Sequence, residues 1–189
     1  MEIVLASKSP RRQELLKTAV PEFSVMVPEF DEGPVMAAGL CPEETVRRLS
    51  LGKALAARER FGAIPERIYI SGDTVVVSPE GEIMGKPRDR ADAKRMLGIL
   101  SGRTHWVITA VTLAGADRER AFTVTTEVDF YPLTEQEIEA YLDTGEPFDK
   151  AGAYGIQGAG GLFVRGIRGD YFNVVGLPVA ELWRALRTF

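Results

Sequence analysis

The sequence contains one cysteine and one histidine, and the scarcity of these residues excludes several kinds of site. A single cysteine, Cys41, cannot form a disulfide within the chain, so we expect a reducing compartment and interpret Cys41 as a small apolar residue. With no second histidine beside His105, the chain lacks a His/Cys cluster for zinc, and a structural role for His105 is favoured over a catalytic one.

Long apolar runs are also absent. No segment is apolar for long enough to span a bilayer, and no basic stretch followed by an apolar run stands at the start. We therefore expect a cytoplasmic protein without a membrane partner. The formal net charge of -4 gives no general attraction for nucleic acid, so any anion-binding site has to be local.

The order of apolar runs and helix signals predicts an α/β fold with a mixed central sheet flanked by helices, in two lobes with a cleft. We expect one domain over residues 1–189. The predicted strands cover residues 3–6, 23–27, 68–70, 74–77, 106–113, 121–130 and 162–167. The predicted helices cover residues 10–18, 42–60, 90–100, 135–145 and 178–187. Asp89 is expected to cap the third of these helices, and Thr134 with Glu137 to form a capping box at the fourth. Residues 33–41 are predicted as a loop, and residues 71–73 as a break between two strands.

The first apolar run ends in the segment Ser7-Lys8-Ser9-Pro10-Arg11-Arg12. Proline is tolerated in the first helical turn and a preceding serine can cap it, so two arginines are expected to open a helix. Backbone N–H groups at a helix start favour an anion, and guanidinium groups suit phosphate oxygens. The segment is therefore either a phosphate site or a surface helix that begins with arginines.

Two acidic positions follow predicted strands. The pair Asp31-Glu32 offers oxygen ligands of the kind that a hard divalent cation takes, although a solvated turn is the ordinary alternative. Asp73 follows an apolar strand in Gly72-Asp73-Thr74, so its carboxylate either caps a turn or does proton or metal work.

Three further side chains are candidates for ligand contacts. Lys53 lies on a predicted helix that also carries several arginines and, taken alone, is typical of a solvated residue. Lys86, in Gly85-Lys86-Pro87, fails the spacing of a Walker phosphate loop but can direct its charge at a phosphate from a turn. Gln157 lies in a glycine-rich stretch without GxGxxG, where its amide suits a base edge and a plain turn is the alternative.

Taken in order, these segments closely resemble the Maf family of nucleoside triphosphate pyrophosphatases. The similarity rests on Leu5-Ala6-Ser7-x-Ser9-Pro10-Arg11-Arg12, Asp31-Glu32, Gly52-Lys53-Ala54, Gly72-Asp73-Thr74-Val75-Val76, Gly85-Lys86-Pro87, Ser101-Gly102-x-x-His105, the glycine-rich segment from Asp149 to Gly158, and Gly169-Asp170-Tyr171-x-Asn173-Val174-Val175-Gly176-Leu177-Pro178. It implies a fold similar to inosine triphosphate pyrophosphatases, a homodimer, and a divalent metal cation, Mg²⁺ or alternatively Mn²⁺.

The glycine-rich segment resembles the branch of the family that acts on dTTP and UTP. The sister branch, which acts on 7-methyl-GTP, usually replaces the residues found here as Lys150 and Gln157. The resemblance assigns roles to nine residues of this sequence. They are Asp73 as the proton acceptor; Arg11, Thr74 and Gln157 for base preference; Ser7, Arg12, Lys53 and Lys86 around the phosphates; and Glu32 with Asp73 for the metal.

The implied reaction is hydrolysis of dTTP, UTP and modified pyrimidine nucleotides between the α- and β-phosphates, which gives a nucleoside monophosphate and pyrophosphate. Two alternatives stay open from the sequence. One is the 7-methyl-GTP activity of the sister branch. The other is a non-catalytic, nucleotide-binding regulator of cell division.

Overall fold

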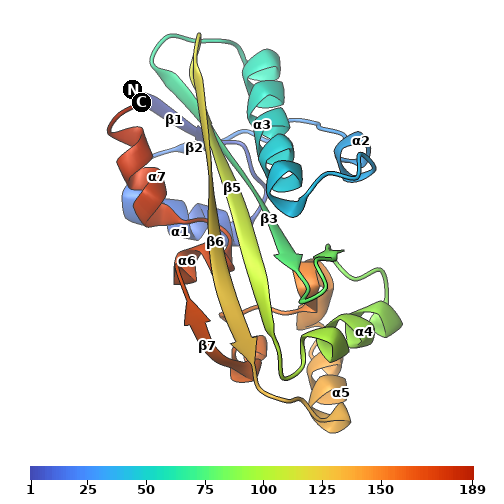
Figure 1. The fold of residues 1–189 in the computed structure, drawn as a ribbon. Coiled ribbons are helices and arrows are strands. Elements are labelled where there is room, and N and C mark those ends of the chain that lie inside the picture. The colour runs from blue at the N-terminus through green and yellow to red at the C-terminus, as the bar shows by residue number, and fades with distance from the viewer. The chain divides into compact units, whose positions relative to one another are not determined.

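A computed structural model describes residues 1–189 and contains a seven-stranded sheet (Figure 1). The strands are β1 (Glu2–Leu5), β2 (Ser24–Val25), β3 (Arg67–Val77), β4 (Ile83–Met84), β5 (Thr104–Ala114), β6 (Glu119–Phe130) and β7 (Val164–Arg168). Their order is β2-β1-β3-β5-β6-β7, with β4 paired to β3. Strand β1 is parallel to β2 and β3, whereas β3–β4 and β6–β7 are antiparallel, so the predicted mixed sheet is confirmed.

Seven α-helices accompany the sheet, and none is long and apolar enough to cross a membrane. They are α1 (Pro10–Ala19), α2 (Gly33–Met36), α3 (Pro42–Phe61), α4 (Arg90–Leu100), α5 (Glu135–Asp143), α6 (Tyr171–Val175) and α7 (Val179–Leu186). Three short 3₁₀ helices follow α5: η1 (Glu146–Asp149), η2 (Ala151–Ala153) and η3 (Ala159–Phe163). The predicted caps are confirmed, because Ser9, Asp89 and Thr134 each accept a backbone N–H in the first turn.

Two local predictions were wrong. Strand β3 does not break at residues 71–73, because it lies between β1 and β5 and keeps its sheet pairing through residues that favour turns. Residues 33–36 form one helical turn instead of a loop, since the N–H of Met36 donates to the Glu32 carbonyl at 3.0 Å. Proline is also suited to a helix start, so Gly33-Pro34 signals a turn and a helix equally well.

The chain divides into two compact units. The first contains Met1–Asp73, Thr109–Val124 and Gly176–Phe189, and the second contains Thr74–Ile108 and Thr125–Val175. In the first unit, β1 and β3 pack their apolar side chains against α3. That core consists of Val4, Ala6, Ala54, Ala57, Tyr69 and Ala114. Helices α1 and α7 of the same unit lie side by side (Figure 1).

The core of the second unit contains a cluster of aromatic rings. Phe130 is fully buried and meets the rings of His105, Tyr154 and Phe163 edge-on, at centroid distances of 4.8, 4.8 and 6.0 Å. His105 Nε2 lies 2.8 Å from the Tyr154 hydroxyl. Burial lowers the pKa of His105 to about 4, so its ring is neutral at pH 7. The structural role predicted for His105 is confirmed.

The packing of this ring cluster can be tested by measuring the free energy of unfolding. Phe130→Ala removes a side chain that contacts three other rings, and it should lower the free energy of unfolding by about 3–5 kcal/mol. Chemical denaturation measures the change. Leu162→Ala, at a residue that is 81% exposed, is the control and should change stability by less than about 0.5 kcal/mol. Equal losses in the two variants would contradict the proposed core.

Candidate active site

The segment between β1 and α1 turns the Arg12 side chain back onto the strands. Ser7 accepts a hydrogen bond from the Ser9 N–H at 3.3 Å and from Arg12 Nη1 at 3.4 Å, while Arg12 Nε donates to the Gly176 carbonyl at 2.9 Å. A Cβ at Gly72 would lie 3.3 Å from Arg12 Nε, so glycine lets the guanidinium approach β3. Arg12 is therefore fixed in position before any ligand arrives.

Helix α3 brings Lys53 to the segment before α2. A Cβ at Gly52 would stand 2.3 Å from the Phe30 ring, so only glycine lets that ring pack on this face of the helix. The neighbouring residues then meet, and Lys53 Nζ lies 2.7 Å from Glu32 Oε1. The interpretation of Lys53 as a solvated residue was wrong, since 19% of its side chain is exposed and it is paired.

Lys53 also forms an ion pair with Asp73 on β3. Its Nζ lies 2.5 Å from Asp73 Oδ1, so one ammonium group joins two carboxylates from different parts of the chain. Asp73 lies inside a continuous strand, and its side chain is 13% exposed. The turn-capping alternative for Asp73 was therefore wrong, and its carboxylate is presented from a rigid element.

Positive charge predominates around these carboxylates. The pKa of Arg12 is lowered, and burial is the main cause. The negative charge of Asp73 opposes that shift. Two smaller effects are a lowering by the charge of Arg11 and a raising by the charge of Glu32. Arg11, Asp73 and Glu32 therefore all lie within electrostatic reach of Arg12. Three cationic side chains and two anionic ones suit a ligand that carries several negative charges.

The first unit thus brings together Ser7, Arg11, Arg12, Glu32, Lys53 and Asp73, which are six of the nine residues predicted from the sequence. The other three are in the second unit, where Thr74 continues β3 directly after Asp73. Lys86 and Gln157 are exposed, and the segments that carry them meet where the Gly152 N–H donates to the Gly85 carbonyl at 3.0 Å.

Sequence reasoning missed a buried hydroxyl cluster beneath Lys53 and Asp73. The Ser71 hydroxyl donates to the Ser50 carbonyl at 2.6 Å, and the Ser50 hydroxyl lies 2.9 Å from that of Thr112. All three residues are fully buried. The cluster connects α3 to β3 one position before Gly72-Asp73, and its only sequence signal is hydroxyl residues within apolar runs.

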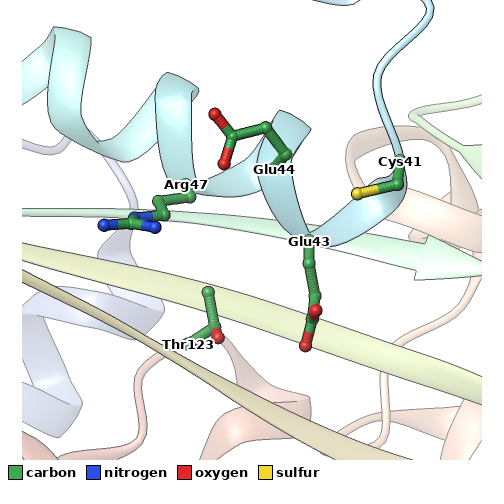
Figure 2. A pocket seen from close by; sticks show the side chains of 5 residues that line it. All are labelled: Cys41, Glu43, Glu44, Arg47 and Thr123. Carbon is green, nitrogen blue, oxygen red and sulfur yellow. The ribbon is translucent and has the colours of Figure 1, made fainter.

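A separate pocket of about 160 Å³ lies in the first unit, at the start of α3 (Figure 2). It is lined by Cys41, Glu43, Glu44, Arg47 and Thr123, none of which is a predicted site residue. Cys41 is an exposed free cysteine there. The thiol directly precedes the helix, where Pro42 occupies the first helical position.

Comparisons with known proteins show which family the chain belongs to. A family model described as "Maf-like protein" matches residues 2–189. A dTTP/UTP pyrophosphatase from Carboxydothermus hydrogenoformans is 53% identical, over 99% of this chain and 98% of its own. A dTTP/UTP pyrophosphatase from Symbiobacterium thermophilum is 49% identical, over 100% of this chain and 94% of its own.

A solved HAM1 protein from Coxiella burnetii has a similar fold. The two structures superimpose with a TM-score of 0.54 over 100% of both chains, at 12% sequence identity. That likeness concerns the fold alone, and it agrees with the mixed α/β sheet flanked by helices.

The ion pairs of Lys53 can be tested by stability measurements. Lys53→Met leaves two half-buried carboxylates facing each other, and it should cost about 1–2 kcal/mol of unfolding free energy at pH 7.

The matched control is Lys94→Met. Lys94 also joins two carboxylates, Glu135 and Glu139, but its side chain is 42% exposed, so the change should cost less than about 1 kcal/mol. Equal costs in the two variants would contradict the two partly buried ion pairs of Lys53.

Proposed function

Because the chain belongs to the Maf-like protein family, we propose that it hydrolyses dTTP and UTP to the nucleoside monophosphate and pyrophosphate. Two relatives named dTTP/UTP pyrophosphatase, about half identical to this chain over nearly its whole length, support that choice of substrate. The observation that carries the proposal is the Lys53 ammonium, which holds Asp73 and Glu32 at 2.5 and 2.7 Å.

Asp73 is the proposed proton acceptor for the attacking water. Its carboxylate projects from a continuous strand, so its position does not depend on a mobile turn. A triphosphate repels a water nucleophile, and catalysis therefore needs both a positioned base and neutralisation of charge. Arg12, Lys53 and Lys86 supply the positive charge in our proposal, and Ser7 adds a hydroxyl beside Arg12.

The residues present fit a divalent metal cation, Mg²⁺ or alternatively Mn²⁺. Glu32 and Asp73 already direct one carboxylate oxygen each at a single cationic nitrogen, and carboxylate oxygens are the ligands that such metals take. No group of three or more His, Cys, Asp or Glu side chains is arranged to hold a metal, so substrate oxygens or water would complete the coordination. When bound, the metal supplies neutralisation of phosphate charge and a lowered pKa for water.

Gln157 is the proposed reader of the base, together with Arg11 and Thr74. An amide presents one acceptor and one donor side by side, which matches a ring carbonyl and the neighbouring imide N–H of uracil or thymine. Gln157 is exposed and therefore accessible to a ligand. Modified pyrimidine nucleotides with the same edge belong to the same substrate class. In line with the family resemblance, we further expect a cytoplasmic homodimer without a nucleic-acid partner.

The role of Asp73 predicts the behaviour of Asp73→Asn. Loss of the proton acceptor should lower kcat for dTTP by about 10²-fold or more, with nucleotide binding largely retained. Pyrophosphate release and equilibrium binding measure the two effects. Asp117→Asn, in the exposed turn between β5 and β6, is the control and should keep wild-type turnover. Turnover at the wild-type rate in Asp73→Asn would remove Asp73 from the proposed role.

The role of Gln157 predicts a change in substrate ranking. Gln157→Glu replaces the amide donor with an acceptor, so the preference for dTTP and UTP over dCTP should fall by about tenfold or more. A panel of canonical triphosphates with 7-methyl-GTP measures the ranking and also tests the sister-branch activity. An unchanged ranking would contradict base reading by Gln157.

A further inference from the structure

The segment that carries Gln157 is held by hydrogen bonds on both sides of that residue. It follows η2 and contains Gly155, Ile156, Gln157 and Gly158 before η3 begins. Three backbone N–H groups of this region, those of Gly155, Ala159 and Gly160, donate to side chains outside it. All three bonds lead to two residues, Tyr141 at the end of α5 and Glu146 at the start of η1.

Glu146 collects most of these bonds. Its Oε2 accepts the Ala159 N–H at 3.0 Å, and its Oε1 accepts the Tyr141 hydroxyl at 2.9 Å and the Gly160 N–H at 3.4 Å. The Tyr141 hydroxyl in turn accepts the Gly155 N–H at 3.2 Å. The backbone before and after Gln157 is thus connected to one carboxylate.

The segment is shaped to admit that carboxylate. A Cβ at Gly158 would stand 2.3 Å from Glu146 Oε1, and a Cβ at Gly160 would stand 2.7 Å from the Tyr141 hydroxyl oxygen. Such distances exclude any larger residue unless these contacts are lost. Gly158 therefore permits the approach of Glu146, and Gly160 permits that of Tyr141.

Charge and packing also fix the carboxylate in place. Burial raises the pKa of Glu146, but hydrogen bonds from the Ala159 N–H, the Tyr141 hydroxyl and the Gly160 N–H outweigh it and hold that pKa below its usual value. Glu146 is thus ionised at neutral pH and can accept all three bonds. The Tyr141 ring packs edge-on against Phe163, with centroids 5.0 Å apart.

We propose that Glu146 is a positioning residue for base recognition, which holds the backbone around Gln157 in the one conformation that presents the Gln157 amide to the nucleobase. This inference rests on the proposed function, because it assumes that Gln157 reads the base. A recognition group discriminates well only when its support is rigid, since ordering a loose segment consumes part of the binding free energy. The Glu146 carboxylate therefore acts on base specificity through the backbone around Gln157, without contacting the ligand.

Glu146→Gln is the primary test. The amide keeps the size of the side chain, but its NH₂ group must face one of the backbone N–H groups, so at least one bond is lost. Amide hydrogen exchange of the peptide that contains residues 155–160 should speed up by about tenfold or more. The ratio of kcat/KM for dTTP to that for dCTP should fall by about tenfold, while kcat/KM for dCTP stays within about twofold.

Two further variants separate positioning from general damage. Tyr141→Phe removes the hydroxyl that joins Glu146 to Gly155, and it should shift exchange and preference in the same direction by a smaller factor. Asp143→Asn makes the same charge change nearby, at a surface ion pair with Arg90, and should leave exchange and preference unchanged. In the double variant Glu146→Gln/Gln157→Ala, the preference should equal that of Gln157→Ala alone, because Glu146 acts through Gln157.

The outcomes distinguish the two proposals. Faster exchange together with lost preference in Glu146→Gln supports the positioning role. Unchanged exchange, an equal loss on dTTP and dCTP, or additive losses in the double variant would overturn it while leaving the proposed function intact. A wild-type protein that releases no pyrophosphate from dTTP or UTP would overturn the proposed function, and the base-positioning role with it.

Discussion

The candidate site depends on one shared ammonium group. Lys53 pairs with Glu32 and Asp73 at the same time, and those carboxylates come from a loop and from a sheet strand. Two carboxylates this close repel each other unless a cation lies between them. The Lys53 ammonium occupies that position, while Ser7 and the Gly176 carbonyl hold the Arg12 guanidinium in place. The arrangement keeps two negative groups together in surroundings where positive charge predominates, as a phosphate-cleaving site requires.

The contacts of the site depend on glycines, which let other side chains approach the backbone closely. Gly52 admits the Phe30 ring and so brings Glu32 to Lys53, while Gly72 admits the Arg12 side chain to β3. In the second unit, Gly158 admits Glu146 and Gly160 admits Tyr141 in the same way. A Cβ at any of these four positions would meet atoms at 2.3 to 3.3 Å, so these glycines are needed for packing as much as for turns.

Much of the fold could be predicted from local signals. Ser9-Pro10, Asp89 and the Thr134–Glu137 box start their helices as expected, because capping depends on residues a few positions apart. The structural settings of Asp73 and Lys53 were harder to predict. Sheet neighbours override the turn signals at residues 71–73, and the ion-pair partners of Lys53 are distant in sequence. Glu146 gave no signal of its own, because its role is visible only once the segment of residues 155–160 is folded over it. The roles given to Lys86, Thr74 and Gln157, like those given to the other six site residues, stay predictions from the family resemblance.

The most direct test of the account is to identify the products formed from dTTP in the presence of Mg²⁺, by ³¹P NMR on the purified wild-type protein. Cleavage between the α- and β-phosphates gives dTMP and pyrophosphate in equal amounts, and that is the predicted spectrum. Formation of dTDP and inorganic phosphate, or no turnover of dTTP and UTP, would contradict the account.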